Sequence, residues 1–155
     1  MDMSELNQPE SSVKKQYDLS NKNVIITGGS GFLGLHFAEA IAEMGGFPIL
    51  LDIDSDGVNK AISHLEQQGI KADGFILDLT DLNQVKATID QVEKKYTHID
   101  VLINAAAFAM KNLQQGGGDF FAPFEEYDKG LWEVSVDINL TGTFLITQAV
   151  GKVMK

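Results

Sequence analysis

Four short runs of β-branched and aliphatic residues alternate with helical patterns along the chain from Asn23 onward. The runs are VIIT at 24–27, FPILLDID at 47–54, ADGFILDL at 72–79 and IDVLINAAA at 99–107. The second run is nearly continuous in apolar residues, as in a strand buried on both faces of a sheet. Strands that alternate with helices predict right-handed crossovers and helices on both faces of a parallel sheet. The expected fold class is therefore α/β, a doubly wound parallel sheet.

Apolar spacing and capping residues place the first helices. The helix after the first run is expected to end at the glycine pair 45–46, and its apolar residues at helical spacing are Leu33, Phe37, Ile41 and Met44. The second helix is predicted at 57–69. The third is predicted at 81–96, capped by Thr80 or Asp81, with an apolar face formed by Leu82, Val85, Ile89 and Val92.

The carboxyl-terminal part has a less regular pattern. After an irregular stretch at 108–124, a helical segment from about Glu125 is expected to continue to the end, with a weak point at 139–142. Four strand–helix units in this order predict a Rossmann-type sheet, whose strand order over the part present should be 3-2-1-4.

Composition indicates one domain and excludes some partners. A chain of 155 residues with 44% hydrophobic residues is long enough for one core, and we expect a polar tail at 1–20 and a domain at 21–155. The net charge of -10 argues against nucleic acid, which needs a basic patch. No apolar run reaches the roughly 20 residues that span a bilayer, and the start has no signal-peptide pattern. With no cysteine either, we expect a cytoplasmic protein with no membrane partner.

Glycines at the end of the first run fall where a strand gives way to a helix. Gly28 allows a tight turn, Gly31 lets the backbone approach a pyrophosphate, and Gly34 lets the helix pack on the strand. The N-terminus of the helix then presents free N–H groups and the positive end of its dipole to the phosphates. The pattern predicts a dinucleotide site, whereas glycines alone would also fit an ordinary turn.

Asp52 ends the second run, 21 residues beyond Gly31. A carboxylate there can accept hydrogen bonds from both ribose hydroxyls of an adenosine, and its charge repels a 2′-phosphate. No Lys or Arg lies in the glycine turn or directly after Asp52. The sequence therefore favours NAD(H) over NADP(H). In the alternative interpretation, Asp52 or Asp54 only caps the next helix.

Five motifs in this order resemble those of the short-chain dehydrogenase/reductase family, over about residues 18–155. The sequence TGGSGFLG at 27–34 resembles the cofactor turn, LDID at 51–54 the ribose-binding strand end and LDLTD at 77–81 the adenine-contacting segment. The strand end Asn-Ala-Gly has its counterpart in VLINAAA, and the helix that carries a catalytic Asn resembles VDINLTGTF.

The resemblance implies an NAD(H)-dependent oxidoreductase that transfers hydride between nicotinamide and an alcohol or ketone carbon. The long loop after the fourth run resembles members that act on polyols and sugar acids. In this family the glycine turn wraps the diphosphate, the segment after the third strand borders the adenine, and the end of the fourth strand runs beside the ribose. The implied cofactor-binding residues are Thr27, Gly28, Ser30, Gly31, Phe32, Leu33, Gly34, Asp52, Ile53, Asp78, Leu79, Asn104, Ala105 and Ala106.

Two motifs depart from the family pattern. The spacing Gly28-x-x-Gly31-x-x-Gly34 is similar to the extended branch of sugar-nucleotide epimerases and dehydratases, which remains an alternative. The more numerous downstream motifs resemble the shorter single-domain oxidoreductases. In INAAA, the family's Asn-Asn-Ala-Gly has lost one Asn and the Gly; cofactor binding should survive, because much of that contact is made by backbone.

Family members use a Tyr as general acid/base, a Lys four residues later that lowers the pKa of the Tyr, and a Ser that polarises the substrate oxygen. Four residues after the three tyrosines of this chain, Tyr17, Tyr96 and Tyr127, stand Asn21, Asp100 and Leu131. The resemblance thus implies the N-terminal half of a longer enzyme, truncated before the catalytic Ser and Tyr-x-x-x-Lys segment and inactive alone. The alternative is a non-catalytic nucleotide-binding or interaction module.

Asn139 is the catalytic-type residue that the resemblance assigns to this chain. In the family this position bends the helix and helps to hold a water that connects to the Lys. In the alternative interpretation, Asn139 and Gly142 are a flaw in the helix, since each weakens a helix interior by up to about 1 kcal/mol.

Other features carry weaker predictions. We expect His36, His64 and His98 to be surface or packed residues on separate elements and expect no metal site. The aromatic loop at 116–124 could line a substrate mouth or pack on the domain. A methyltransferase with a similar turn is disfavoured by the Thr27-Gly28 start and by the lack of an acidic residue directly before the glycines. An uncovered fourth strand and apolar faces at 144–154 favour a homo-oligomer.

Overall fold

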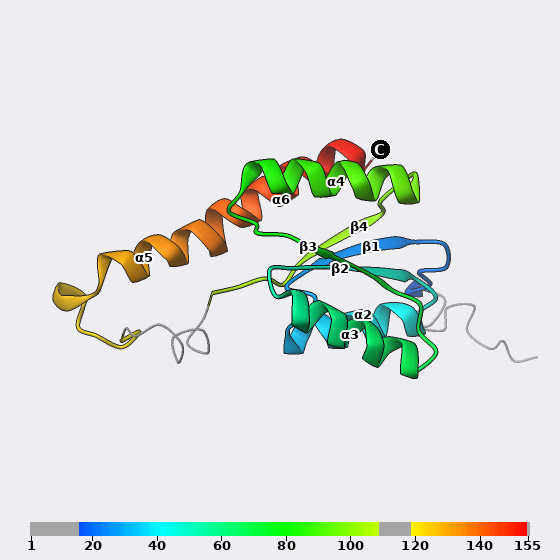
Figure 1. The fold of residues 1–155 in the computed structure, drawn as a ribbon, viewed down its shortest axis with the longest axis horizontal. Helices are drawn as coiled ribbons and strands as arrows, with labels where there is room; N and C mark the ends of the chain where they lie inside the picture. The colour runs from blue at the N-terminus through cyan, green and yellow to red at the C-terminus, as the bar shows by residue number, and fades with distance from the viewer. Residues whose placement is uncertain (1–15, 109–118, 155) are drawn as a thin grey trace, which may run out of the picture.

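The strands form one parallel sheet with the order β3-β2-β1-β4, which confirms the predicted fold class and topology. The computed structural model describes residues 16–108 and 119–154 (Figure 1). Its strands are β1 (Asn23–Thr27), β2 (Phe47–Asp52), β3 (Asp73–Ile76) and β4 (Val101–Asn104). β2, β3 and β4 are shorter than predicted, because residues beyond Asp52, Ile76 and Asn104 leave the ladder at the carboxyl edge of the sheet.

Two helical layers cover the sheet (Figure 1). Helices α2 (Phe32–Glu43) and α3 (Ser55–Gln67) lie on one face, and α4 (Leu82–Tyr96) and α6 (Thr143–Val153) lie on the other. Alternation along β1 divides the core, since Ile25 packs with the α4 and α6 layer and its two neighbours pack with the α2 and α3 layer. Burial on both faces explains the continuous apolar runs in the sequence.

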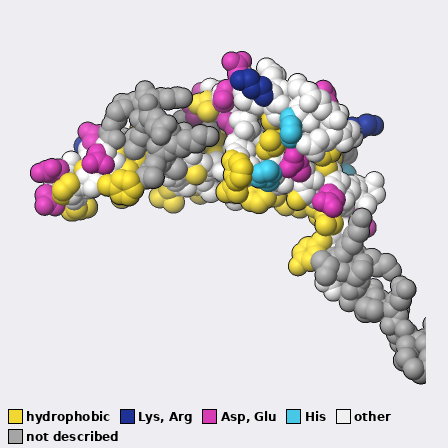
Figure 2. Space-filling view, turned by 90° about the horizontal axis from the view of Figure 1, so that it is seen from below, with side chains coloured by type: hydrophobic (Ala, Val, Ile, Leu, Met, Phe, Trp, Pro, Cys, Tyr) yellow, Lys and Arg dark blue, Asp and Glu magenta, His cyan; other side chains and the backbone are white. Residues whose placement is uncertain are grey.

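The buried face of α2 differs from the predicted one. Gly34, Ala38 and Ile41 are buried, whereas the side chains of Leu33 and Phe37 are 59% and 36% exposed. The rotation of the helix is set by Gly34, where a Cβ would overlap the carbonyl oxygen of Gly28. That close approach turns the side chain of Leu33 outward. Figure 2 shows hydrophobic side chains gathered along one border of the surface formed by α2 and α3.

The single final helix that the sequence predicts is divided in the structure into three helical segments, and a short turn precedes them. A 3₁₀ turn, η3 (Phe124–Glu126), is followed by α5 (Lys129–Val136), the π-helical segment η4 (Asp137–Gly142) and α6. The expected start near Glu125 is wrong, because Asp128 caps α5 by accepting a hydrogen bond from the backbone N–H of Leu131 at 2.8 Å. The predicted weak point at 139–142 lies within η4.

The amino-terminal segment joins the domain before its first strand. The backbone N–H of Leu19 donates to the carbonyl of Met44 at 2.8 Å, and the Leu19 side chain packs on the core. Residues 1–15 of the predicted tail and 109–118 of the predicted loop lie outside the described residues. No helix in the part of the chain that the structure describes is long and apolar enough to cross a membrane.

Asp100 connects the start of β1 to the loop before β4. Its carboxylate accepts hydrogen bonds from the backbone N–H of Asn23 at 2.9 Å and from the Lys22 ammonium at 2.8 Å. The Nε2 of His98 lies 3.3 Å from the Asp100 Oδ2. Burial opposes the charge, but the bonds from Lys22 and Asn23 outweigh it and lower the pKa of Asp100.

Replacing Asp100 with alanine should lower the free energy of unfolding by about 1–2 kcal/mol at pH 7. Because the pKa of Asp100 is lower in the folded chain, its contribution is complete above the ordinary aspartate pKa and is lost as the pH falls through the folded value. Urea unfolding at pH 7 and pH 3 measures both effects. An equal difference between wild type and D100A at the two pH values would contradict this account.

Candidate functional site

The predicted site residues meet at the carboxyl edge of the sheet. Thr27, Asp52 and Asn104 are the last residues of β1, β2 and β4, and Asp78 lies two residues beyond β3. The glycine turn leads from β1 into α2 at the same edge. The chain returns from β3 through α4 to place β4 beside β1, so the strand order reverses between β1 and β4, and this edge contains the switch point at which open α/β sheets bind ligands.

Three glycines of the turn differ in what a side chain at each would contact. Gly28 has a φ of +63°, and a Cβ there would lie 2.8 Å from the Ala106 Cα. A Cβ on Gly34 would overlap the Gly28 carbonyl oxygen. At Gly31, by contrast, a Cβ would meet only that oxygen, at 3.2 Å. Packing within the chain therefore explains Gly28 and Gly34, whereas Gly31 leaves open backbone at the surface.

The N-terminus of α2 has no side-chain cap. Gly31 is its N-cap residue, whereas Asp54, Asp81 and Asp128 cap α3, α4 and α5 with their carboxylates. The bond from the Leu35 N–H to the Gly31 carbonyl, at 2.9 Å, is the first of the helix. The N–H groups of the first turn before it have no acceptor one turn back. These donors and the positive end of the dipole face the carboxyl edge.

Asp52 is held by the glycine turn. Its Oδ2 accepts hydrogen bonds from the Ser30 N–H at 3.1 Å and from the Ser30 hydroxyl at 2.7 Å, and its Oδ1 accepts one from the Asp54 N–H at 3.2 Å. Asp54 is the residue that caps α3, because it accepts a bond from the Gly57 N–H at 3.0 Å. The capping interpretation therefore applies to Asp54 and is wrong for Asp52.

Residues after β2 and β3 differ in what they present at the edge. Ile53 is 65% exposed beside Asp52. Asp78 is turned to its own loop, where its Oδ1 accepts bonds from the Thr80 N–H at 2.9 Å and the Thr80 hydroxyl at 2.7 Å. The Leu79 side chain lies in the core, and a Cβ on Gly142 would stand 3.0 Å from the Leu79 Cβ. Leu79 thus packs against η4, and only its backbone remains near the edge.

The ends of β1 and β4 are joined through Thr27. Its buried hydroxyl oxygen accepts hydrogen bonds from the N–H groups of Ala105 and Ala106 at 3.1 and 3.2 Å. The Asn104 amide donates to the Thr147 hydroxyl of α6 at 3.1 Å. Both side chains therefore hold elements together at the edge of the site.

Asn139 lies in η4 and is paired with the backbone of Phe108. Its Oδ1 accepts from the Phe108 N–H at 2.8 Å and its Nδ2 donates to the Phe108 carbonyl at 3.1 Å. Sequence reasoning did not identify Phe108 as this partner, nor the bond from Ser30 to Asp52. The partner residues are 31 and 22 positions apart in the chain, and no local pattern connects them.

The aromatic residues of the predicted loop divide into two groups. Phe120 packs between Phe108 and Tyr127, with ring centroids 6.0 and 6.5 Å apart. Phe121 and Phe124 are 79% and 94% exposed.

Histidines come together on the outer surface of one helical layer. His36 and His64 lie at the surface on separate helices, α2 and α3, as expected, and they contact the two oxygens of Glu39 at 2.9 and 3.2 Å. The hydrogen bond from His36, with those from Gln68 and His64, lowers the pKa of Glu39 to about 2. Within residues 16–108 and 119–154, no group of His, Cys, Asp and Glu is arranged to hold a metal ion.

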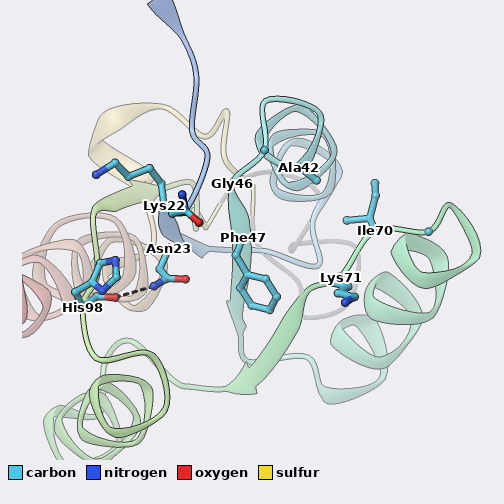
Figure 3. A pocket seen from close by; sticks show the side chains of 11 residues that line it. Lys22, Asn23, Ala42, Gly46, Phe47, Ile70, Lys71 and His98 are labelled. Atoms are coloured by element: carbon cyan, nitrogen blue, oxygen red, sulfur yellow. Dashed lines mark hydrogen bonds between the residues drawn. The ribbon is translucent and has the colours of Figure 1, made fainter. Parts of the chain in front are cut away.

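A hollow of about 560 Å³ opens at the opposite edge of the sheet, beside the amino ends of β1 and β2 (Figure 3). Asn23 in its wall donates to the His98 carbonyl at 3.0 Å, and the Lys22 ammonium is paired with Asp100. The predicted cofactor residues do not line this hollow.

Comparisons with known proteins agree with this architecture. Galactitol 2-dehydrogenase of Agrobacterium fabrum is 35% identical over 137 residues, which cover 88% of this chain and 48% of that protein. The crystal structure of NAD⁺-bound xylitol dehydrogenase has a TM-score of 0.77 and 30% identity, covering 87% of this chain and 48% of that one. An actinorhodin polyketide ketoreductase variant with NADPH has a TM-score of 0.74 and 27% identity, covering 85% and 47%.

The chain spans about half the length of the curated relatives that it matches. The model of the short chain dehydrogenase family matches residues 22–155, which include the whole sheet and both helical layers. This chain belongs to the short chain dehydrogenase family of oxidoreductases.

Proposed function

We propose that the chain binds NAD(H) at the carboxyl edge of its sheet and serves an oxidoreductase that acts on an alcohol or ketone carbon. The observation that carries the proposal is the open, uncapped N-terminus of α2 at Gly31, beside the fixed carboxylate of Asp52. Membership of the family supports oxidoreductase chemistry. When bound, the nicotinamide would supply or accept the hydride.

The glycine turn fits the diphosphate of the cofactor. A Cβ at Gly31 would meet the Gly28 carbonyl oxygen at 3.2 Å and no other atom within 4 Å, at the helix end that carries the uncapped N–H donors. Those donors and the dipole of α2 would bind the phosphate oxygens, while Phe32 and Leu33 expose their side chains at the same helix end. Asn104, Ala105 and Ala106 would run beside the adenosine ribose, and Asp78 and the Leu79 backbone would border the adenine.

The preference for NAD(H) rests on the negative charge after β2. Asp52, Asp54 and Asp56 alternate along this segment, and no Lys or Arg lies at 28–34 or 52–57. Three carboxylates at one strand end would repel a 2′-phosphate and leave the ribose hydroxyls as the favoured partners. Since similar structures contain NAD⁺ and NADPH, the residues of this chain must decide the preference.

Asn139 would shape the reacting side of the site. Its two bonds to Phe108 fix η4 against the segment after β4, and a π-helical segment leaves backbone carbonyls outside the ordinary helical pattern. Such a carbonyl could hold the water of a proton relay. The acid/base Tyr, its Lys and the Ser would belong to the half that the relatives have beyond the matched part. Similarity to xylitol and galactitol dehydrogenases favours a polyol or a related ketose as substrate.

Calorimetric titration with NADH tests the ribose contact. Asp52→Ala should weaken NADH binding by about tenfold or more, because a charge-assisted acceptor of the ribose hydroxyls is lost. Asp54→Ala is the matched control: it removes a carboxylate two residues away and should lower helix stability with little effect on NADH affinity. Folded wild-type chain that binds neither NADH nor NADPH would instead favour a non-catalytic interaction module.

The turn glycines provide a second test. Gly31→Ala should change the free energy of unfolding by less than about 1 kcal/mol and weaken NADH binding about tenfold, because its Cβ points into the proposed phosphate site. Gly34→Ala should lower the free energy of unfolding by about 3 kcal/mol, because its Cβ overlaps backbone. Thermal unfolding measures the stability of each variant, and NADH titration measures its cofactor affinity. Unchanged NADH affinity in G31A would contradict the phosphate site.

Self-association is proposed from the exposed apolar residues of the last helices. Trp132, Leu140 and Phe144 are 62%, 67% and 59% exposed, which is unfavourable for an isolated monomer. Light scattering over a range of concentrations should show a dimer or larger species, and W132S should shift it toward the monomer. A monodisperse wild-type monomer at high concentration would refute the proposal.

A further inference from the structure

We propose that Ser30 is a positioning residue that sets the preference for a ribose 2′-hydroxyl over a 2′-phosphate by holding the carboxylate of Asp52. The inference rests on the proposed NAD(H) site and identifies a residue that acts through Asp52. Ser30 lies in the glycine turn, in the loop between β1 and α2, and Asp52 ends β2. The bond between them therefore joins the phosphate-binding turn to the ribose-binding strand end.

Three donors fix the orientation of the Asp52 carboxylate. The Ser30 hydroxyl and N–H both reach Oδ2, at 2.7 and 3.1 Å, and the Asp54 N–H reaches Oδ1 at 3.2 Å. The hydroxyl bond is the shortest of the three and the only one a side chain supplies. A carboxylate has about four lone-pair sites, and these bonds use two on Oδ2 and one on Oδ1, so Oδ1 keeps an acceptor site for a ribose hydroxyl. The acceptor is thus preorganised before a ligand arrives.

Gly57 provides the space that the Ser30 hydroxyl occupies. A Cβ on Gly57 would lie 2.8 Å from the Ser30 Oγ and 2.7 Å from the Asp54 Oδ2. The first turn of α3 therefore packs directly against the hydroxyl. This contact limits the positions open to the Ser30 side chain and favours the rotamer that bonds to Asp52.

Fixing the carboxylate affects the two cofactors in opposite directions. A ribose 2′-hydroxyl gains from an acceptor that needs no reorientation on binding. A 2′-phosphate meets a negative charge that cannot turn away. Without the Ser30 hydroxyl, only the two longer backbone bonds hold Asp52, so its carboxylate rotates toward solvent more readily, which costs NADH an aligned acceptor and relieves the repulsion of NADPH. A general loss of structure would weaken both cofactors together, so the ratio of the two affinities identifies the positioning role.

The test measures NADH and NADPH affinity by calorimetry for wild type, Ser30→Ala and Ser55→Ala. Ser55→Ala is the matched control, because it makes the same chemical change at an exposed residue that begins α3 and makes no bond to Asp52 among the described residues. Ser30→Ala should weaken NADH about three- to tenfold and leave NADPH unchanged or tighter. Gly57→Ala, which displaces the hydroxyl by crowding, should lower the NADH-to-NADPH preference in the same direction.

The outcomes separate this inference from the proposed function. A wild-type chain that binds NADH better than NADPH, with the same ratio in S30A, would overturn the positioning role and leave the NAD(H) site intact. Equal weakening of both cofactors in S30A, with a lower Tm, would assign Ser30 a purely structural function and also overturn it. Wild type that binds neither cofactor would refute the NAD(H) site itself.

Discussion

The close approach of the glycine turn to the end of β4 is the constraint on which the rest of the carboxyl edge depends. Gly28, in a left-handed conformation, lies against the backbone of Ala105 and Ala106, and Gly34 lies against the carbonyl of Gly28. These backbone contacts set the distance from β1 to β4 and the rotation of α2. The Thr27 hydroxyl secures the same junction through two further bonds. The helix N-terminus is consequently fixed in direction before any ligand is present.

Two hydrogen-bonded pairs fix the positions of elements farther from the glycine turn. The Ser30 and Asp52 pair connects the turn to β2, and the Asn139 and Phe108 pair connects η4 to the segment after β4. Neither pair contributes much apolar burial, and each is made at the surface of the core. Stability and site geometry are thus partly separate in this chain: the apolar layers hold the sheet together, whereas hydrogen bonds at the edge set the positions of the groups that would face a cofactor.

Strand order and helix layers could be predicted from the sequence, because apolar runs and helical spacing indicate which residues are buried. The buried face of α2 could not be predicted in this way. Leu33 and Phe37 follow the apolar spacing, but Gly34 brings the helix so close to the turn that small residues must face inward. The predicted helix start near Glu125 was wrong because the apolar pattern does not show which residue caps the helix. Asp128 caps α5, so the helix begins after it. The motif positions predicted which residues gather at the edge. The partners that orient them depend on long-range contacts that no local pattern contains.

The π-helical segment makes the direction of α5 depend on a residue count. A π turn contains one residue more than an α turn, and each residue of an α-helix rotates the chain by about 100°. With one residue fewer between Val136 and Thr143, α5 would rotate by roughly that angle relative to α6, and Asn139 would no longer face Phe108. In Figure 1, α5 extends beyond the sheet as an arm. The rotation of this arm about its axis is therefore determined by the same six residues of η4 that place Asn139 at the site.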